Sequence, residues 1–176
     1  MFEVSGLVAT VVGAFMAAGL SGVGSAYGTH IVGSANATAM AEGEGEKFSN
    51  FIILQALPGT QGIYGFVILF MILMQSGITG GNLNISSDSG QVAFWAGTLM
   101  GVNGLFSAIL QGRVAAMTVP VAVKYPEETM KAAMFSVIVE LYALLALVGS
   151  LIIILNGVEK GTSTQEIITS FVNLFG

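Results

Sequence analysis

Glu140 lies within a continuous apolar stretch that runs from Ala132 to Leu155. A helix of this length crosses a bilayer, because about 20 apolar residues at about 1.5 Å each span the hydrocarbon core. Glu140 follows Lys131 by nine residues, which places it about 13 Å along the helix and near the middle of a core about 30 Å thick. An unneutralised carboxylate is costly there. We therefore expect a site for a proton or a metal cation; the alternative is a polar side chain that joins two helices.

The composition is that of a membrane protein. Hydrophobic residues make up 54% of the 176 residues and charged residues only 9%, whereas a soluble domain carries about 25% charged residues. The absence of cysteine excludes disulfides and thiolate metal sites. A net charge of −5 without a basic patch argues against a nucleic-acid partner. The first five residues lack the basic stretch of a cleaved signal peptide, so we expect the first helix to stay in the mature protein.

Four long apolar segments, at about 4–40, 48–78, 91–123 and 130–156, are separated by short polar loops. They predict an all-α membrane protein with four transmembrane helices, arranged as two tandem helical hairpins. The first hairpin is expected over residues 1–78 and the second over residues 91–156. Residues 157–176 form a C-terminal extension, in which the apolar spacing predicts a short helix at the membrane surface; a frayed terminus is the alternative.

Basic residues predict the orientation of these helices. Four of the five Lys and Arg residues lie in or near the first and third loops. Positive charge favours the cytoplasmic side, so these two loops are expected in the cytoplasm and both termini outside. The four residues are Lys47, Arg113, Lys124 and Lys131.

The second half of the chain repeats the first, since residues 21–27 align with residues 107–113. The first and third helices each carry small residues at every fourth position, which lie on one face and allow close packing. The first and third helices are thin because of these small side chains, and each is followed by a helix with bulkier side chains. This pairing predicts a ring with the thin helices inside; an ordinary four-helix bundle is the alternative. The two stripes are Ala9, Gly13, Ala17, Ser21 and Ser25, and Gly104, Ala108, Gly112 and Ala116.

Other oxygen-bearing side chains are predicted at the depth of Glu140. Gln111 precedes Pro126, at the tip of the third loop, by fifteen residues and Glu140 follows it by fourteen, so the two come level in an antiparallel hairpin. In the second helix, Pro58 removes a backbone donor and frees carbonyl oxygens. Within the membrane, such free carbonyl oxygens are tolerated only where a buried group binds them.

Thr60 and Gln61 follow this break directly. Carbonyl, hydroxyl, amide and carboxylate oxygens are hard ligands, which suit Na⁺ better than a transition metal. A proton would need only the acid, so the additional oxygens favour Na⁺. Hydrogen bonds between helices are the alternative role for each of these polar side chains.

Three segments, residues 54–66, 111–116 and 139–143, resemble the membrane-ring proteolipid (c/K subunit) of V-type ATPases, in its bacterial Na⁺-translocating form. The likeness covers about residues 5–156, and the Leu-Pro-Gly-Thr-Gln-Gly string is its most specific part. The resemblance implies a Na⁺ site in which Tyr64 hydrogen-bonds the carboxylate. The implied ligands are Leu57, through its carbonyl, Thr60, Gln61, Gln111 and Glu140.

The same resemblance implies a function. It indicates a non-catalytic rotor-ring subunit of the bacterial cytoplasmic membrane, with Na⁺ as the transported ion and no other cofactor. The expected partners are copies of the same chain, a stator membrane subunit with an essential arginine, the central stalk of the ATPase and the lipid bilayer. Two alternatives stay open: the same ring carrying H⁺, and a non-rotary four-helix channel or structural membrane protein.

Overall fold

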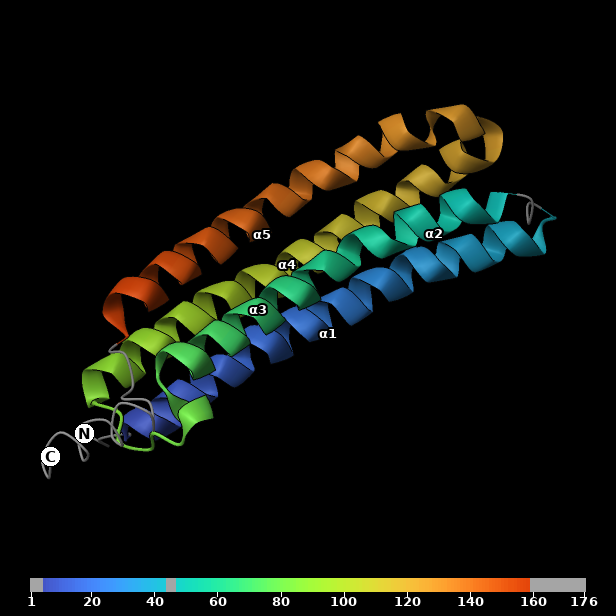
Figure 1. Cartoon of the computed structure of the whole chain (residues 1–176). Coiled ribbons are helices and arrows are strands. Elements are labelled where there is room, and N and C mark those ends of the chain that lie inside the picture. Colours follow the sequence, from blue (N-terminus) through green and yellow to red (C-terminus); the bar gives the residue numbers. More distant parts are fainter. Residues whose placement is uncertain (1–4, 44–46, 159–176) are drawn as a thin grey trace, which may run out of the picture.

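The structure of the chain, a computed structural model, describes residues 5–43 and 47–158. Residues 159–176, which make up all but the start of the predicted extension, lie outside this part. The described part consists of helices joined by short turns (Figure 1). The α-helices are α1 (Gly6–Ala41), α2 (Phe48–Ala56), α3 (Thr60–Gln75), α4 (Ser87–Lys124) and α5 (Thr129–Gly157). Three 3₁₀ turns, η2 (Leu57–Gly59), η3 (Ile78–Gly80) and η4 (Pro126–Glu128), lie between them.

Four helical segments of the described chain are long and apolar enough to cross a membrane. They are α1, the combined α2–η2–α3 segment, α4, and α5 with the η4 turn before it. The prediction of an all-α protein with four transmembrane helices is therefore confirmed. Each of these segments has at least 28 residues, and such a length exceeds the roughly 20 residues that a bilayer core requires.

The helix boundaries follow from local sequence signals. Ser5 and Ser86 cap α1 and α4, since their hydroxyl oxygens accept the backbone N–H of the residue three positions later at 3.4 Å and 3.3 Å. The cap explains why α4 begins at Ser87, four residues before the predicted start. At the other end of the first hairpin, α3 stops before Gly77, whose φ of 75° is readily available only to glycine.

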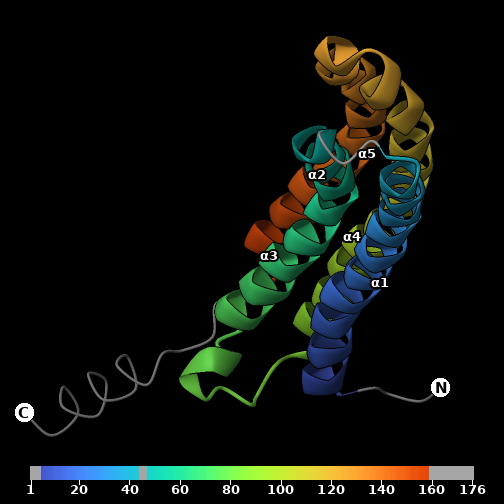
Figure 2. The same ribbon diagram turned by 90° about the vertical axis from the view of Figure 1, so that its right-hand side faces the viewer.

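The two thin helices, α1 and α4, pack backbone against backbone. A Cβ atom added at Gly97 of α4 would lie 2.0 Å from the carbonyl oxygen of Gly13 in α1, and one added at Gly112 would lie 2.5 Å from that of Gly28. Figure 2 shows α1 and α4 in one layer, with α2–α3 and α5 beside them. The predicted stripes of small residues therefore form the contact between the two repeats, although Ala115 rather than Ala116 is the buried member near the end of α4.

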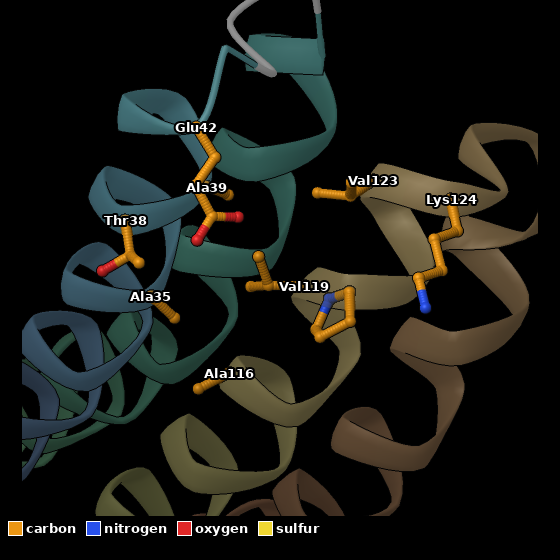
Figure 3. Close-up of a pocket in the computed structure, with 9 residues that line it drawn as sticks. Ala35, Thr38, Ala39, Glu42, Ala116, Val119, Val123 and Lys124 are labelled. Atoms are coloured by element: carbon orange, nitrogen blue, oxygen red, sulfur yellow. The ribbon is translucent and has the colours of Figure 1, made fainter.

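A hollow of about 360 Å³ lies where the last turns of α1 and α4 face each other (Figure 3). It is lined by small side chains, by Pro120 within α4, and by the oppositely charged Glu42 and Lys124. A proline inside a helix removes a hydrogen bond and bends the helix. A bend at Pro120 allows a hollow to form between two helices that are otherwise closely packed. This hollow contains none of the six residues implied in the Na⁺ site.

Candidate functional site

The break in the second transmembrane segment lies at Pro58, as predicted. Residues Leu57–Gly59 form a 3₁₀ turn between α2 and α3. The carbonyl oxygen of Leu57 accepts the backbone N–H of Thr60 and also its side-chain hydroxyl, at 3.1 Å. The carbonyl and the hydroxyl therefore lie side by side at the start of α3, close enough to contact one ion together.

Glu140 of α5 is held by side chains from two other helices. The phenol of Tyr64 in α3 donates a hydrogen bond of 2.5 Å to Oε1 of Glu140. The amide nitrogen of Gln111 in α4 donates one of 3.3 Å to the other carboxylate oxygen, Oε2. The predicted match in depth between Gln111 and Glu140 is confirmed by this contact. The carboxylate is thus aimed at the space between α3, α4 and α5.

Gln61 connects the break to the carboxylate. Its Nε2 atom donates hydrogen bonds to Oε1 of Gln111 and, at 3.4 Å, to the hydroxyl of Ser107. Both of these donations are directed at α4. The Oε1 atom of Gln61 lies 3.4 Å from the hydroxyl of Thr60, whose single proton is shared between this oxygen and the Leu57 carbonyl. Gln61 and Gln111 are both fully buried. One hydrogen-bonded network therefore runs from the Leu57 carbonyl through Thr60 and the two glutamines to Glu140.

The structure brings all six predicted site residues into this network. They come from the η2 turn, from three helices and from sequence positions as far apart as Leu57 and Glu140. Two further hydrogen bonds tie α4 to α5 at the same level. The hydroxyl of Ser107 donates to the Val139 carbonyl at 3.1 Å, and that of Ser136 to the Gln111 carbonyl at 3.2 Å. These paired bonds fix the position of Gln111 relative to Glu140.

The charge of the network comes from one carboxylate. Within residues 5–43 and 47–158, no basic side chain forms an ion pair with Glu140, and no group of three or more His, Cys, Asp or Glu side chains is placed to hold a metal ion. A single carboxylate surrounded by neutral oxygens matches the charge of a monovalent cation. It offers too little negative charge for the multi-carboxylate binding typical of divalent ions.

Ser25 and Ser107 were not identified as site residues from the sequence. Ser25 belongs to the first stripe of small residues and Ser107 lies next to Ala108 of the second. In such a sequence a serine is indistinguishable from a glycine or alanine that serves only close packing. In the structure, both hydroxyl groups contact the residues around the network. A usable signal was present, because Ser107 precedes Gln111 by four residues and therefore lies on the same helix face.

Comparisons with known proteins agree with this architecture. A family model that describes the ATP synthase C subunit matches the chain twice, over residues 12–72 and 94–153. The chain is 41% identical over 155 residues to the V-type sodium ATPase subunit K of Enterococcus hirae, a match that covers 86% of this chain and 93% of the relative. It is 35% identical over 164 residues to the A-type ATP synthase subunit K of Methanocaldococcus jannaschii, covering 93% of this chain and 69% of the relative.

Proposed function

Because this chain belongs to the family of the ATP synthase C subunit, we propose that each copy carries one Na⁺ at Glu140, with Leu57, Thr60, Gln61 and Gln111 supplying the other oxygens. The family membership itself makes the chain a non-catalytic, ion-carrying subunit of the membrane rotor ring of a rotary ATPase. The alternative of a non-rotary channel or structural protein is thereby set aside.

The observation that supports Na⁺ is the set of neutral oxygens around one carboxylate. Proton binding needs the carboxylate alone, and in this network the hydroxyl of Thr60 and the carbonyl of Leu57 lie 3.1 Å apart, next to the Gln61 amide oxygen. Hard oxygen ligands of this kind suit an alkali cation. The relative from Enterococcus hirae, which is named as a sodium ATPase subunit, supports the same choice.

Tyr64 has a different role in this proposal. Its hydroxyl donates to Glu140, so it leaves the carboxylate charged and oriented rather than supplying an oxygen to the ion. With Oε1 engaged by Tyr64, Oε2 stays on the side of Gln111. Since a preorganised ligand loses less entropy when the ion binds, the Tyr64 hydrogen bond favours binding without contacting Na⁺.

Rotation would carry the ion across the membrane. A carboxylate at membrane depth must be neutralised at every stage, by the ion, by a proton or by a basic partner. In our proposal, the essential arginine of a stator subunit neutralises Glu140 between release of one ion and binding of the next. The central stalk couples this rotation to ATP hydrolysis. This chain has one such carboxylate in four membrane-spanning segments. A ring of such chains moves fewer ions per turn than a ring of the same number of helices with a carboxylate in every two segments. Fewer ions per turn favour ATP-driven pumping over ATP synthesis.

The orientation completes the proposal. We place the loops that join α1 to α2 and α4 to α5 in the bacterial cytoplasm and both termini outside, on the basis of Lys47, Lys124 and Lys131. Arg113, which was expected in or near the loop, lies within α4, eleven residues before its end, and does not support this orientation. The side chain of Asn50 supports a joint surface for these loops, since it donates to the Pro126 carbonyl at 3.2 Å and to the Thr129 hydroxyl at 3.0 Å. Accessibility of a single cysteine introduced at Glu127 to a membrane-impermeant reagent tests this orientation.

Protection of Glu140 from a hydrophobic carbodiimide tests the choice of ion. The reagent attacks the protonated carboxyl group, so a bound Na⁺ blocks the reaction. At constant pH, we expect labelling of the purified ring to fall as Na⁺ is added and to be unaffected by the same concentration of K⁺. Labelling that follows pH alone would identify a proton-carrying ring instead. Absence of any labelling would contradict an accessible intramembrane carboxyl group at this position.

A further inference from the structure

A side chain of α1 enters the break between α2 and α3. The hydroxyl oxygen of Ser25 accepts the backbone N–H of Gly62 at 2.8 Å, and the same hydroxyl donates to the carbonyl oxygen of Gly59 at 3.4 Å. Ser25 is buried, with 8% of its surface exposed. Between the two backbone groups that it contacts lie Thr60 and Gln61, two of the residues in the network around Glu140.

Ser25 takes the place of a missing helix cap. The first N–H groups of a helix have no partners within it, and a side chain just before the helix normally accepts one of them. The N-cap position of α3 is Gly59, which has no side chain and makes no capping hydrogen bond. The residue before it, Pro58, lacks an N–H of its own. The backbone N–H of Gly62 is therefore capped by a side chain of a neighbouring helix instead of a local one.

We infer that Ser25 is a positioning residue of the ion site, which fixes the backbone of residues 59–62 and thereby aims the Leu57 carbonyl, the Thr60 hydroxyl and the Gln61 amide at one point. This inference rests on the proposed Na⁺ site. It explains how a helix weakened by Pro58 and Gly59 can still present three oxygens in a defined geometry. Ser25 itself contacts neither Glu140 nor Tyr64 through any hydrogen bond of the described chain.

Ser21 provides a matched control on the same helix. It lies one turn before Ser25 on the same face of α1, is fully buried, and also donates to a backbone carbonyl. Its acceptor is Met100 of α4, at 3.3 Å, rather than the break. Replacing Ser21 with alanine therefore removes the same chemical group from the same helix while leaving the contacts of residues 59–62 in place.

The test compares Ser25→Ala, Ser21→Ala and the unchanged chain as assembled rings. Carbodiimide labelling of Glu140 is measured against Na⁺ concentration at fixed pH, and separately against pH without Na⁺. We expect Ser25→Ala to need about fivefold to tenfold more Na⁺ for half-protection, in line with the loss of a helix-capping hydroxyl. Its pH profile without Na⁺ should match that of the unchanged ring, because Tyr64 and Gln111 still contact the carboxylate. Ser21→Ala should resemble the unchanged ring in both measurements.

The possible failures are distinguishable. If Na⁺ does not protect the unchanged ring, the proposed function is wrong. If Na⁺ protects the unchanged ring but Ser25→Ala and Ser21→Ala need the same concentration, Ser25 is not a positioning residue. A shift of the pH profile in Ser25→Ala would also overturn the inference, since it would mean a general disruption around Glu140. Should Ser25→Ala rings fail to assemble, the comparison is made with Ser25→Cys. A thiol has a similar shape but is a weaker donor and acceptor than a hydroxyl, so the Na⁺ concentration for half-protection should rise about threefold.

Discussion

The phenol of Tyr64 and the carboxylate of Glu140 meet at a hydrogen-bond distance of 2.5 Å, although the two residues lie 76 positions apart in the chain. This contact joins the first hairpin to the second at the depth of the intramembrane charge. It also gives the carboxylate a donor from α3 in addition to the amide of Gln111 from α4. The site is therefore assembled across the two repeats, and neither hairpin contains it alone.

Removing the Tyr64 hydroxyl should weaken the site while leaving it in place. In Tyr64→Phe, the carboxylate loses the donor that holds it toward Gln111, so we expect Na⁺ affinity to fall about threefold to tenfold, in line with the net contribution of about 0.5–1.5 kcal/mol from a typical hydrogen bond. Tyr142→Phe is the control, because Tyr142 lies exposed on the same helix as Glu140. Half-protection of Glu140 by Na⁺ gives the measurement, and equal values for both variants would exclude an orienting role for Tyr64.

Neutralising Glu140 should stop transport without preventing assembly. Glu140→Gln keeps the size of the side chain and its hydrogen-bonding capacity but removes the charge that balances the ion in our proposal. In the reconstituted complex, we expect loss of Na⁺ transport and of coupled ATP hydrolysis, together with a ring of normal size in native gels. Asp88→Asn, in the first turn of α4, is the control for loss of a carboxylate outside the site. Full Na⁺ transport by Glu140→Gln would show that another group carries the ion.

The two buried glutamines, Gln61 and Gln111, should determine the affinity of the ring for Na⁺. Replacing Gln61 or Gln111 with leucine removes one of the proposed oxygen ligands and leaves Glu140 able to bind a proton. We expect the Na⁺ affinity to fall at least tenfold, which corresponds to about 1.4 kcal/mol. Gln75→Leu provides the control, since Gln75 donates to the Val158 carbonyl near the end of the bundle. An unchanged Na⁺ dependence of ATP hydrolysis in both variants would mean that the ligands are assigned incorrectly.

Close packing of the repeats predicts a stability effect at Gly97. A Cβ there would lie 2.0 Å from the Gly13 carbonyl oxygen, and the atoms in its way belong to backbone. Gly97→Ala should therefore lower the thermal stability of the ring strongly or prevent its assembly. Gly19→Ala is the control, because a Cβ at Gly19 meets no atom of the same chain within 4 Å. Similar melting temperatures for the two variants would contradict the backbone-to-backbone contact of α1 and α4.

The main elements of this fold could be predicted because each depends on a local pattern. Apolar length predicts the four membrane segments, Pro58 predicts the break, and counting from the loop at Pro126 predicts that Gln111 and Glu140 come level. The start of α4 differed by four residues, since the Ser86 cap extends the helix beyond its apolar part. These local patterns predict the folded structure well because a membrane-spanning segment must form the hydrogen bonds of its backbone within itself.

The contacts of the serines could not be predicted in the same way. Whether Ser25 packs as a small residue or hydrogen-bonds Gly62 depends on how closely α1 approaches the break, and that distance is set by tertiary packing. The hollow beside Pro120 likewise depends on the relative course of α1 and α4. The surface helix predicted for the C-terminal extension falls on residues 159–176, outside the described part of the chain.

Equilibrium binding of radioactive Na⁺ to the purified ring tests the Na⁺ site at Glu140 most directly. We expect saturable binding of one Na⁺ per chain, displaced by unlabelled Na⁺ but not by the same concentration of K⁺. In rings made of Glu140→Gln chains, this binding should be lost while the ring stays assembled. Saturable binding that persists in Glu140→Gln, or no saturable binding to the unchanged ring, would contradict a Na⁺ site at this carboxylate.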